Sequence, residues 1–177
     1  MENIYLKTKE KSTCNGCTAC AYICPKGAIK MIEDNEGFIY PVIIEEKCIK
    51  CGKCLRTCSN HSLNEDRQYT AYAGVNNNKD VLGQSTSGGA YSALVERLFS
   101  KNNSVCYGVA YNNSFDVVHM RATNIKEAEQ FRGSKYLRSN ILGVYENVKK
   151  DLKEGKDVLH IAFTSGLSGS YNSARIA

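Results

Sequence analysis

The sequence predicts an α+β protein built from two parts, and two observations indicate this class. Eight of the nine cysteines lie between residues 14 and 58, in two runs with the same spacing. We therefore expect a small cysteine-rich domain over residues 1–62. After a polar linker at residues 63–70, stretches with the periodicity of strands and of helices alternate along the chain. This alternation predicts part of an α/β domain over residues 71–155.

The two cysteine runs share the spacing C-x2-C-x2-C-x3-C, and the second begins 34 residues after the first. This spacing is typical of bacterial ferredoxins, in which three thiolates of a run bind one cubane [4Fe–4S] cluster and the fourth binds the neighbouring cluster. The sequence therefore predicts two clusters with crossed ligands. The first set is Cys14, Cys17, Cys20 and Cys58, and the second is Cys48, Cys51, Cys54 and Cys24.

Zinc and disulfide bonds are the two alternatives for these cysteines. Structural zinc sites use C-x2-C pairs with a longer gap between them and often include His. Here a third Cys follows at once, and no His lies inside either run. Disulfides need an oxidising compartment and suitable Cα separations, and thiols packed this closely suit a metal better. The spacing therefore favours two cubane clusters.

A β-hairpin is predicted between the two cysteine runs. Residues 28–32 alternate apolar and polar, a turn is expected at residues 34–37, and residues 38–44 form the second strand. Pro25 follows Cys24 as in ferredoxins, whereas Ser59 stands at the equivalent position of the second run. So small a domain has little hydrophobic core. We therefore expect the clusters to hold it together and the iron-free form to be largely unfolded.

The second part is predicted to contain four strands, at residues 70–75, 104–111, 115–122 and 157–163. The second and third of these should form a hairpin around an Asn-Asn-Ser turn. The strands alternate with helical patterns, which is why an α/β arrangement is expected.

Three helices are expected between these strands. The first follows an N-cap at Ser85 or Ser87, and a short one at residues 126–132 is closed by Gly133. The third, at residues 142–155, has Gly155 at its C′ position. The residues expected to face inward are Ala90, Leu94 and Leu98 in the first helix, with Val95 and Phe99 beside them, and Leu142, Tyr145, Val148 and Leu152 in the third.

Two glycine-containing turns have either a binding or a structural interpretation. The turn at residues 85–89 leads into a helix, whose free N–H groups and dipole can bind a phosphate, but an ordinary helix cap has the same pattern. In residues 133–139, Lys135 and Arg138 could hold an anionic cofactor or face solvent. Both interpretations stay open from these residues alone.

The remaining thiol and the histidines are predicted to be structural. Cys106 lies in the middle of a predicted strand and should be buried as a small hydrophobic residue. His61, His119 and His160 are isolated from one another in the sequence. No Ser/His/Asp arrangement and no paired carboxylates indicate hydrolysis, so no catalytic residue is predicted.

Charge and hydropathy limit the classes of partner. The formal net charge of +5 falls to about +1 when two oxidised clusters, about −2 each with their thiolates, are included. Lys and Arg are scattered rather than clustered, so no nucleic-acid partner is expected. The N-terminal residues lack an apolar signal-peptide region, and no apolar run is long enough for a membrane span. We therefore expect a cytoplasmic protein.

Several stretches occur in an order that resembles one family. They read CNGCTACAYICPKGAI, EGFIYPVI, CIKCGKC, YAGV, STSGGAYSAL, VCYGVAY and FRGSKYLRS. Over about residues 10–155 they resemble the coenzyme F-420 hydrogenase/dehydrogenase beta-subunit family, in the version with an N-terminal 4Fe-4S dicluster ferredoxin domain. The resemblance implies a dicluster ferredoxin domain followed by a partial α/β flavin-type domain. It also implies FAD near Ser87, Gly88, Gly89, Gly133, Ser134 and Lys135.

The last residues resemble a different family. From about residue 153 the chain is similar to the DegV fatty-acid-binding family, in which one turn helps to hold a lipid carboxylate. The corresponding residues here are Thr164, Ser165, Gly166 and Ser168. We therefore expect a DegV-like tail at residues 156–177 that is too short for a lipid pocket. Only the N-terminal part of the flavin-type domain is expected before it.

Three functional hypotheses follow. The first is iron–sulfur electron transfer within a flavin-linked oxidoreductase, whose partners are a redox protein or subunit and a deazaflavin or other small redox substrate. The chain would be an oxidoreductase subunit if the flavin domain is functional. The second is a plain ferredoxin-type electron carrier with an incomplete, non-catalytic C-terminal appendage, holding about eight iron and eight sulfide per chain and no flavin. The third is a fragment whose α/β part does not fold.

Overall fold

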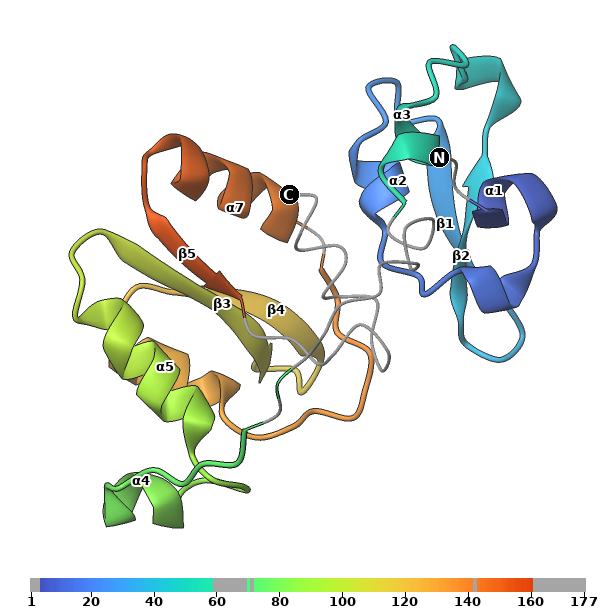
Figure 1. Cartoon of the computed structure of the whole chain (residues 1–177). Coiled ribbons are helices and arrows are strands. Elements are labelled where there is room, and N and C mark those ends of the chain that lie inside the picture. Colours follow the sequence, from blue (N-terminus) through green and yellow to red (C-terminus); the bar gives the residue numbers. More distant parts are fainter. Residues whose placement is uncertain (1–3, 59–69, 71, 142, 161–177) are drawn as a thin grey trace. The chain divides into compact units, whose positions relative to one another are not determined.

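The computed structural model describes residues 4–58, 70, 72–141 and 143–160 (Figure 1). The chain divides into two compact units between Arg67 and Gln68. The described residues up to 58 belong to the first unit, and those from 70 onward belong to the second. The predicted linker at residues 63–70 lies almost wholly outside the described residues.

The first unit contains a two-stranded antiparallel sheet, formed by β1 (Ile29–Glu33) and β2 (Ile39–Ile43). Ile29 lies opposite Ile43, and Glu33 lies opposite Ile39. The turn between the strands forms because the carboxylate of Asp34 accepts the N–H groups of Glu36 and Phe38, both at 3.0 Å. The predicted hairpin is confirmed.

Short helical turns flank this hairpin. They are α1 (Ile4–Thr8), η1 (Lys11–Thr13), α2 (Ala19–Tyr22), η2 (Glu45–Lys47) and α3 (Lys53–Arg56). The core beside them is small: Leu6, Cys20 and Ile29 are its buried members, and Cys24 and Cys54 pack against them. Thiols therefore take the place that larger apolar side chains would occupy in a bigger domain.

The second unit contains a three-stranded sheet in the order β4-β3-β5. β3 (Ser104–Tyr111) and β4 (Val117–Ala122) form the predicted antiparallel hairpin. Its turn is fixed by Asn112, whose side-chain oxygen accepts the N–H groups of Ser114 and Asp116. β5 (Asp157–His160) runs parallel to β3. The first residues of the segment expected to form the tail thus belong to this sheet, and residues 161–177 lie outside the described part.

Helices cover both faces of this sheet. On one face α5 (Ala90–Phe99), α6 (Ile125–Ala128) and the 3-10 turn η4 (Glu129–Phe131) pack against the even-numbered residues of β3. Gly108 allows this approach, because a Cβ there would lie 2.5 Å from the ring of Phe131. On the other face α7 (Val144–Lys153) packs against Val105 and Tyr107. The result is the expected α/β layering, a sheet between two layers of helix (Figure 1).

Two predictions about the start of this unit are wrong. Residues 70 and 72–75 form no strand; instead the N–H of Asn76 donates to the carbonyl of Gly88 at 2.7 Å, so this segment pairs with the glycine turn. A further short helix, α4 (Lys79–Gly83), follows it and is capped by the side chain of Asn78. The N-cap of α5 is Gly89, in the left-handed region at φ 75°, and not Ser85 or Ser87.

The inward faces of the two long helices also differ from the prediction. In α5, Leu98 packs on the core as predicted, together with Val95 and Phe99, which were expected beside that face, whereas Leu94 is 51% exposed and Ala90 is also exposed. In α7, Val148 packs inward as predicted and Gly155 follows the helix at positive φ, but Leu152 is 46% exposed. The buried members of α7 are Val144 and Asp151. Leu142 lies outside the described residues. None of the helices that the structure describes is long and apolar enough to cross a membrane.

Candidate metal centres

Two cavities in the first unit are lined by cysteine thiols. The first thiol cavity has a volume of about 20 Å³ and the second about 230 Å³. Each brings together three cysteines of one motif and the fourth cysteine of the other. The first is lined by Cys14, Cys17, Cys20 and Cys58, and the second by Cys24, Cys48, Cys51 and Cys54.

The backbone of each motif turns twice through the left-handed region, and these turns bring successive cysteines to one side of the loop. Gly16 and Thr18 have φ of 66° and 64° in the first motif, and Lys50 and Gly52 have 53° and 71° at the equivalent positions of the second. Glycine is the residue best suited to such positions. α2 and α3 then begin directly after these turns.

The fourth cysteine of each motif reaches the opposite loop because the two short helices pack together. Cys20 and Cys24, on and just after α2, share one core cluster with Cys54 and Leu55 of α3. This packing carries Cys24 to the wall of the second cavity. The same arrangement carries Cys58, which follows α3, to the wall of the first cavity.

One thiol in each cavity has a raised pKa. Burial, and then the charges of Cys17, Cys14 and Cys58, raise the pKa of Cys20 to about 12. Burial is also the main cause that raises the pKa of Cys54. Since metals bind thiolates, any metal taken up here must displace protons.

Backbone amides and one guanidinium support the thiol loops. The N–H of Ala28 donates to the Sγ of Cys24 at 3.2 Å, and the N–H of Cys17 donates to the side-chain oxygen of Asn15 at 3.2 Å. Arg56 donates to the carbonyl of Cys51 at 3.3 Å. A hydrogen bond to a ligand sulfur orients it and tunes the metal that it binds.

The chemistry of the donors fits an iron–sulfur cluster. Soft thiolates are the ligands of such clusters, and each cavity offers four of them. Among the described residues, no three His, Cys, Asp or Glu side chains converge on a position for a single metal ion. A cubane cluster has a different requirement, because its four thiolates bind four different irons and surround a body of several atoms. The second thiol cavity is large enough for several atoms, whereas the first has room for about one water-sized group in this structure.

The glycine turn proposed for flavin binding has a structural role. A Cβ at Gly88 would lie 2.2 Å from the carbonyl oxygen of Gly74, and one at Gly89 would lie 2.9 Å from the Cβ of Asn76. Glycine is therefore required here by the close approach of residues 74–76. Ser87 lies in the same turn, before the N-terminus of α5.

The second stretch proposed for flavin binding also has its own internal contacts. Gly133 has φ of 80°, and Ser134 follows it. The ammonium group of Lys135 donates to the carbonyls of Gln130, Arg132 and Gly133 at 2.9–3.1 Å. The charge of Lys135 is thus used to close the turn after η4.

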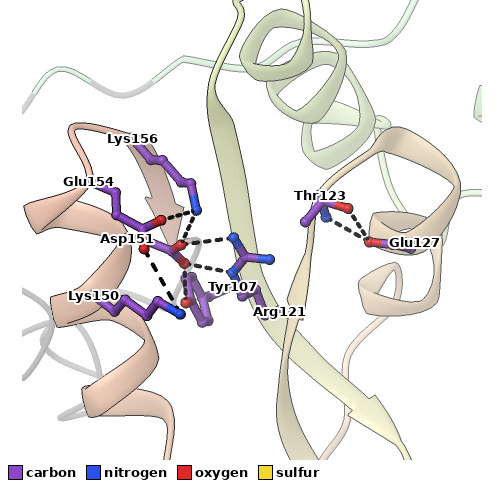
Figure 2. A network of polar contacts seen from close by, with 8 residues as sticks. All are labelled: Tyr107, Arg121, Thr123, Glu127, Lys150, Asp151, Glu154 and Lys156. Atoms are coloured by element: carbon purple, nitrogen blue, oxygen red, sulfur yellow. Dashed lines mark hydrogen bonds and ion pairs between the residues drawn. The ribbon is translucent and has the colours of Figure 1, made fainter.

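Sequence reasoning missed a buried carboxylate in the second unit. Asp151 of α7 is 3% exposed and receives hydrogen bonds from Tyr107, from Arg121 at 2.6 and 2.8 Å, and from Lys156 at 2.8 Å (Figure 2). The periodicity predicted Leu152 at the inward position beside it. A lone Asp within an amphipathic helix carries no sequence signal that would reveal these partners.

The two strand histidines, which are isolated from one another in the sequence, meet in the fold. The rings of His119 on β4 and His160 on β5 stack with centroids 5.9 Å apart. Cys106 is fully buried in β3 as predicted. His61 and the four residues of the DegV-like turn lie outside the described residues.

Comparison with known proteins supports the interpretation of the first unit. Residues 13–62 match the family model of the 4Fe-4S dicluster domain. A search of curated proteins finds no match to the chain. The first unit is thus similar to 4Fe-4S dicluster domains, and its class of function is iron–sulfur electron transfer. The comparisons do not support the resemblance to the coenzyme F-420 hydrogenase beta subunit, the resemblance to DegV proteins, or FAD.

Proposed function

We propose that the first unit carries electrons through two [4Fe–4S] clusters, each held by thiolates of both motifs. The observation that supports this most strongly is the composition of the two thiol cavities, each of which combines three cysteines of one motif with the fourth of the other. One cluster is then held by Cys14, Cys17, Cys20 and Cys58, and the other by Cys48, Cys51, Cys54 and Cys24.

The residues around the cavities set the environment of the clusters. When bound, each cluster supplies a one-electron redox couple. Ile29, Ile43 and Leu55 line the second thiol cavity and limit the access of water. The amide of Ala28 stabilises negative charge on Cys24. Because thiols of both cavities pack in one core cluster, an electron can pass between the two sites over a short distance.

A flavin-linked oxidoreductase is the second candidate function, and one contact favours it. The guanidinium of Arg132 donates to the side-chain oxygen of Gln84 at 2.7 Å. This bond joins the stretch that precedes Gly133 to the turn that leads to Gly88 and Gly89, so the two stretches proposed for flavin are neighbours. A flavin would have to use groups other than the ammonium of Lys135 there, since Lys135 already binds three carbonyls.

Anaerobic preparation with iron, sulfide and flavin measured together tests both candidates. We expect about eight iron and eight sulfide per chain, with an EPR signal from reduced clusters. Flavin in a ratio near one per chain would establish the second candidate, and its absence would leave the plain carrier. Zinc in place of iron, or four iron per chain, would contradict the two-cluster proposal.

A further inference from the structure

We propose that the rim of the second thiol cavity is the docking face for an acidic redox protein. This inference rests on the proposed electron-transfer function and adds to it the route by which electrons leave. Three lysines line that cavity, Lys26, Lys50 and Lys53, and we call them the lysine rim. The acidic group lining the same cavity is Glu45.

The internal duplication provides a built-in comparison between the two sites. The cysteines of the two motifs align in sequence at an offset of 34 residues, but the residues between them differ. Gly16 and Ala19 of the first motif correspond to Lys50 and Lys53 of the second. The same cysteine spacing is therefore surrounded by small neutral residues at one site and by two cations at the other. Cluster binding alone does not explain this difference, since both motifs carry all four thiols.

The backbone shows that glycine would fit the position of Lys50. Lys50 has φ of 53°, in a region that L side chains seldom adopt, and the equivalent Gly16 has φ of 66°. The first motif carries the same kind of strain at its other turn, where Thr18 has φ of 64° at the position equivalent to Gly52. The fold of the loop therefore does not require a lysine at position 50.

Exposure also distinguishes the second cavity. Cys51 is exposed, and Ile49 beside it is 57% exposed, whereas Cys17, the equivalent of Cys51 in the first motif, is only partly exposed. An exposed apolar side chain within a ring of charges is typical of a protein interface. A cluster held by Cys51 would lie near the surface of the unit, where an electron can pass to a docked partner.

The charge of the lysine rim indicates which kind of protein binds there. Lysines around a small apolar centre attract carboxylates and raise the rate of association with an acidic surface. The second unit of this chain is a poor match, because residues 70–160 contain 12 Lys and Arg against 9 Asp and Glu. A second copy of the first unit presents the same lysines. An acidic partner protein therefore fits this face best.

The test uses the cluster-loaded full chain and two small redox proteins as probes, an acidic rubredoxin and a basic cytochrome c. Carbodiimide cross-linking joins lysines to carboxylates, and mass spectrometry of the product should find the links at Lys26, Lys50 and Lys53. We expect the double variant K50E/K53E to bind rubredoxin at least tenfold more weakly at low salt. The matched control K30E makes the same kind of charge change on β1, outside both cavity linings, and should change binding less than twofold.

Lys50→Gly separates docking from a structural role. It restores the residue of the first motif, so cluster content and stability should stay equal or increase while rubredoxin binding weakens. The inference is overturned if K30E weakens binding as much as K50E/K53E does, if cytochrome c binds equally well, or if the cross-links join the lysine rim to this chain's own carboxylates or to a second copy. Iron and sulfide are measured in every sample. A protein without clusters contradicts the proposed function, whereas a loaded protein that does not bind contradicts only the docking face.

Discussion

The hydroxyl of Tyr107 donates to the carboxylate of Asp151 at 2.5 Å, and this bond joins the central strand β3 to α7. Arg121 on β4 binds the same carboxylate from the next strand, and Lys156 binds it from the position just before β5 (Figure 2). The hydrogen bonds from Arg121 are the main cause that holds the pKa of Asp151 well below its usual range. One buried carboxylate thus ties α7 to the sheet.

Replacing Asp151 by Asn should strongly destabilise the second unit. The change removes a buried counterion from two partly exposed cations, Arg121 and Lys156, of which Lys156 keeps Glu154 as a partner. Breaking a largely buried ion pair of this kind costs about 3 kcal/mol. Tyr107→Phe removes one hydrogen bond and should cost about 1–2 kcal/mol. Chemical denaturation followed by the circular dichroism of the second unit measures both. Equal effects of the two variants would contradict the central role of the carboxylate.

The stacked histidines predict a loss of stability in mildly acidic solution. Burial, and then the charge of His160, lower the pKa of His119 from 6.5 to about 4, and burial lowers the pKa of His160 as well. Between pH 6.5 and 4 the unfolded chain therefore binds more protons than the folded one, so the free energy of unfolding falls as the pH falls.

Denaturation at a series of pH values measures this effect. Between pH 6.5 and 4, the slope of the unfolding free energy against pH should correspond to the binding of about one proton by His119 on unfolding, with a further contribution from His160. His119→Gln should remove the first of these contributions. A slope unchanged by His119→Gln would show that other groups carry the pH dependence.

The glycine turn before α5 predicts a sharp contrast between two alanine substitutions. Gly88→Ala places a Cβ 2.2 Å from the carbonyl oxygen of Gly74, and overpacking of this kind costs about 2–3 kcal/mol. Gly83→Ala, at the end of α4, meets no atom within 4 Å and should be neutral or stabilising by up to about 1 kcal/mol. Thermal unfolding of the two variants provides the comparison. A tolerated Gly88→Ala would favour a ligand-binding role for this glycine over the packing role.

Removal of iron should unfold the first unit and leave the second intact. The core of the first unit consists largely of cysteines and a few apolar residues, so the clusters supply much of its folding free energy. Hydrogen exchange after chelation should show rapid exchange at Lys30 and Ile32 of β1, which lie in the hydrogen-bonded pairs with β2. The amides of Val105 and Tyr107 in β3 should keep their protection. Protection of β1 in the iron-free protein would show that the small core suffices without metal.

The cysteine grid and the hairpin were predictable from sequence because each depends on local spacing. Asp34 fixes the β1–β2 turn within four residues, and the cysteine spacing indicates the crossed grouping without knowledge of the remaining chain. The helix faces were harder to predict. Periodicity favours the apolar Leu152, but the ion pairs of the neighbouring Asp151 rotate the polar residue inward instead.

Contacts between distant residues account for the other misses. His119 and His160 are 41 residues apart in sequence, and they meet only because β4 and β5 flank the same strand. In the same way, Gly88 and Gly89 favoured a phosphate-binding turn in the sequence, whereas the approach of Gly74 and Asn76 explains them in the structure. No local pattern contains this information.

The EPR spectrum of the reduced Cys24→Ala variant tests the central claim most directly. Cys17→Ala and Cys51→Ala provide reference spectra for damage at the first and the second site, and Cys106→Ala, which changes a thiol outside both cavities, controls for the loss of a cysteine. Crossed ligation predicts that Cys24→Ala matches Cys51→Ala and leaves the other cluster intact. A spectrum that matches Cys17→Ala would contradict the account.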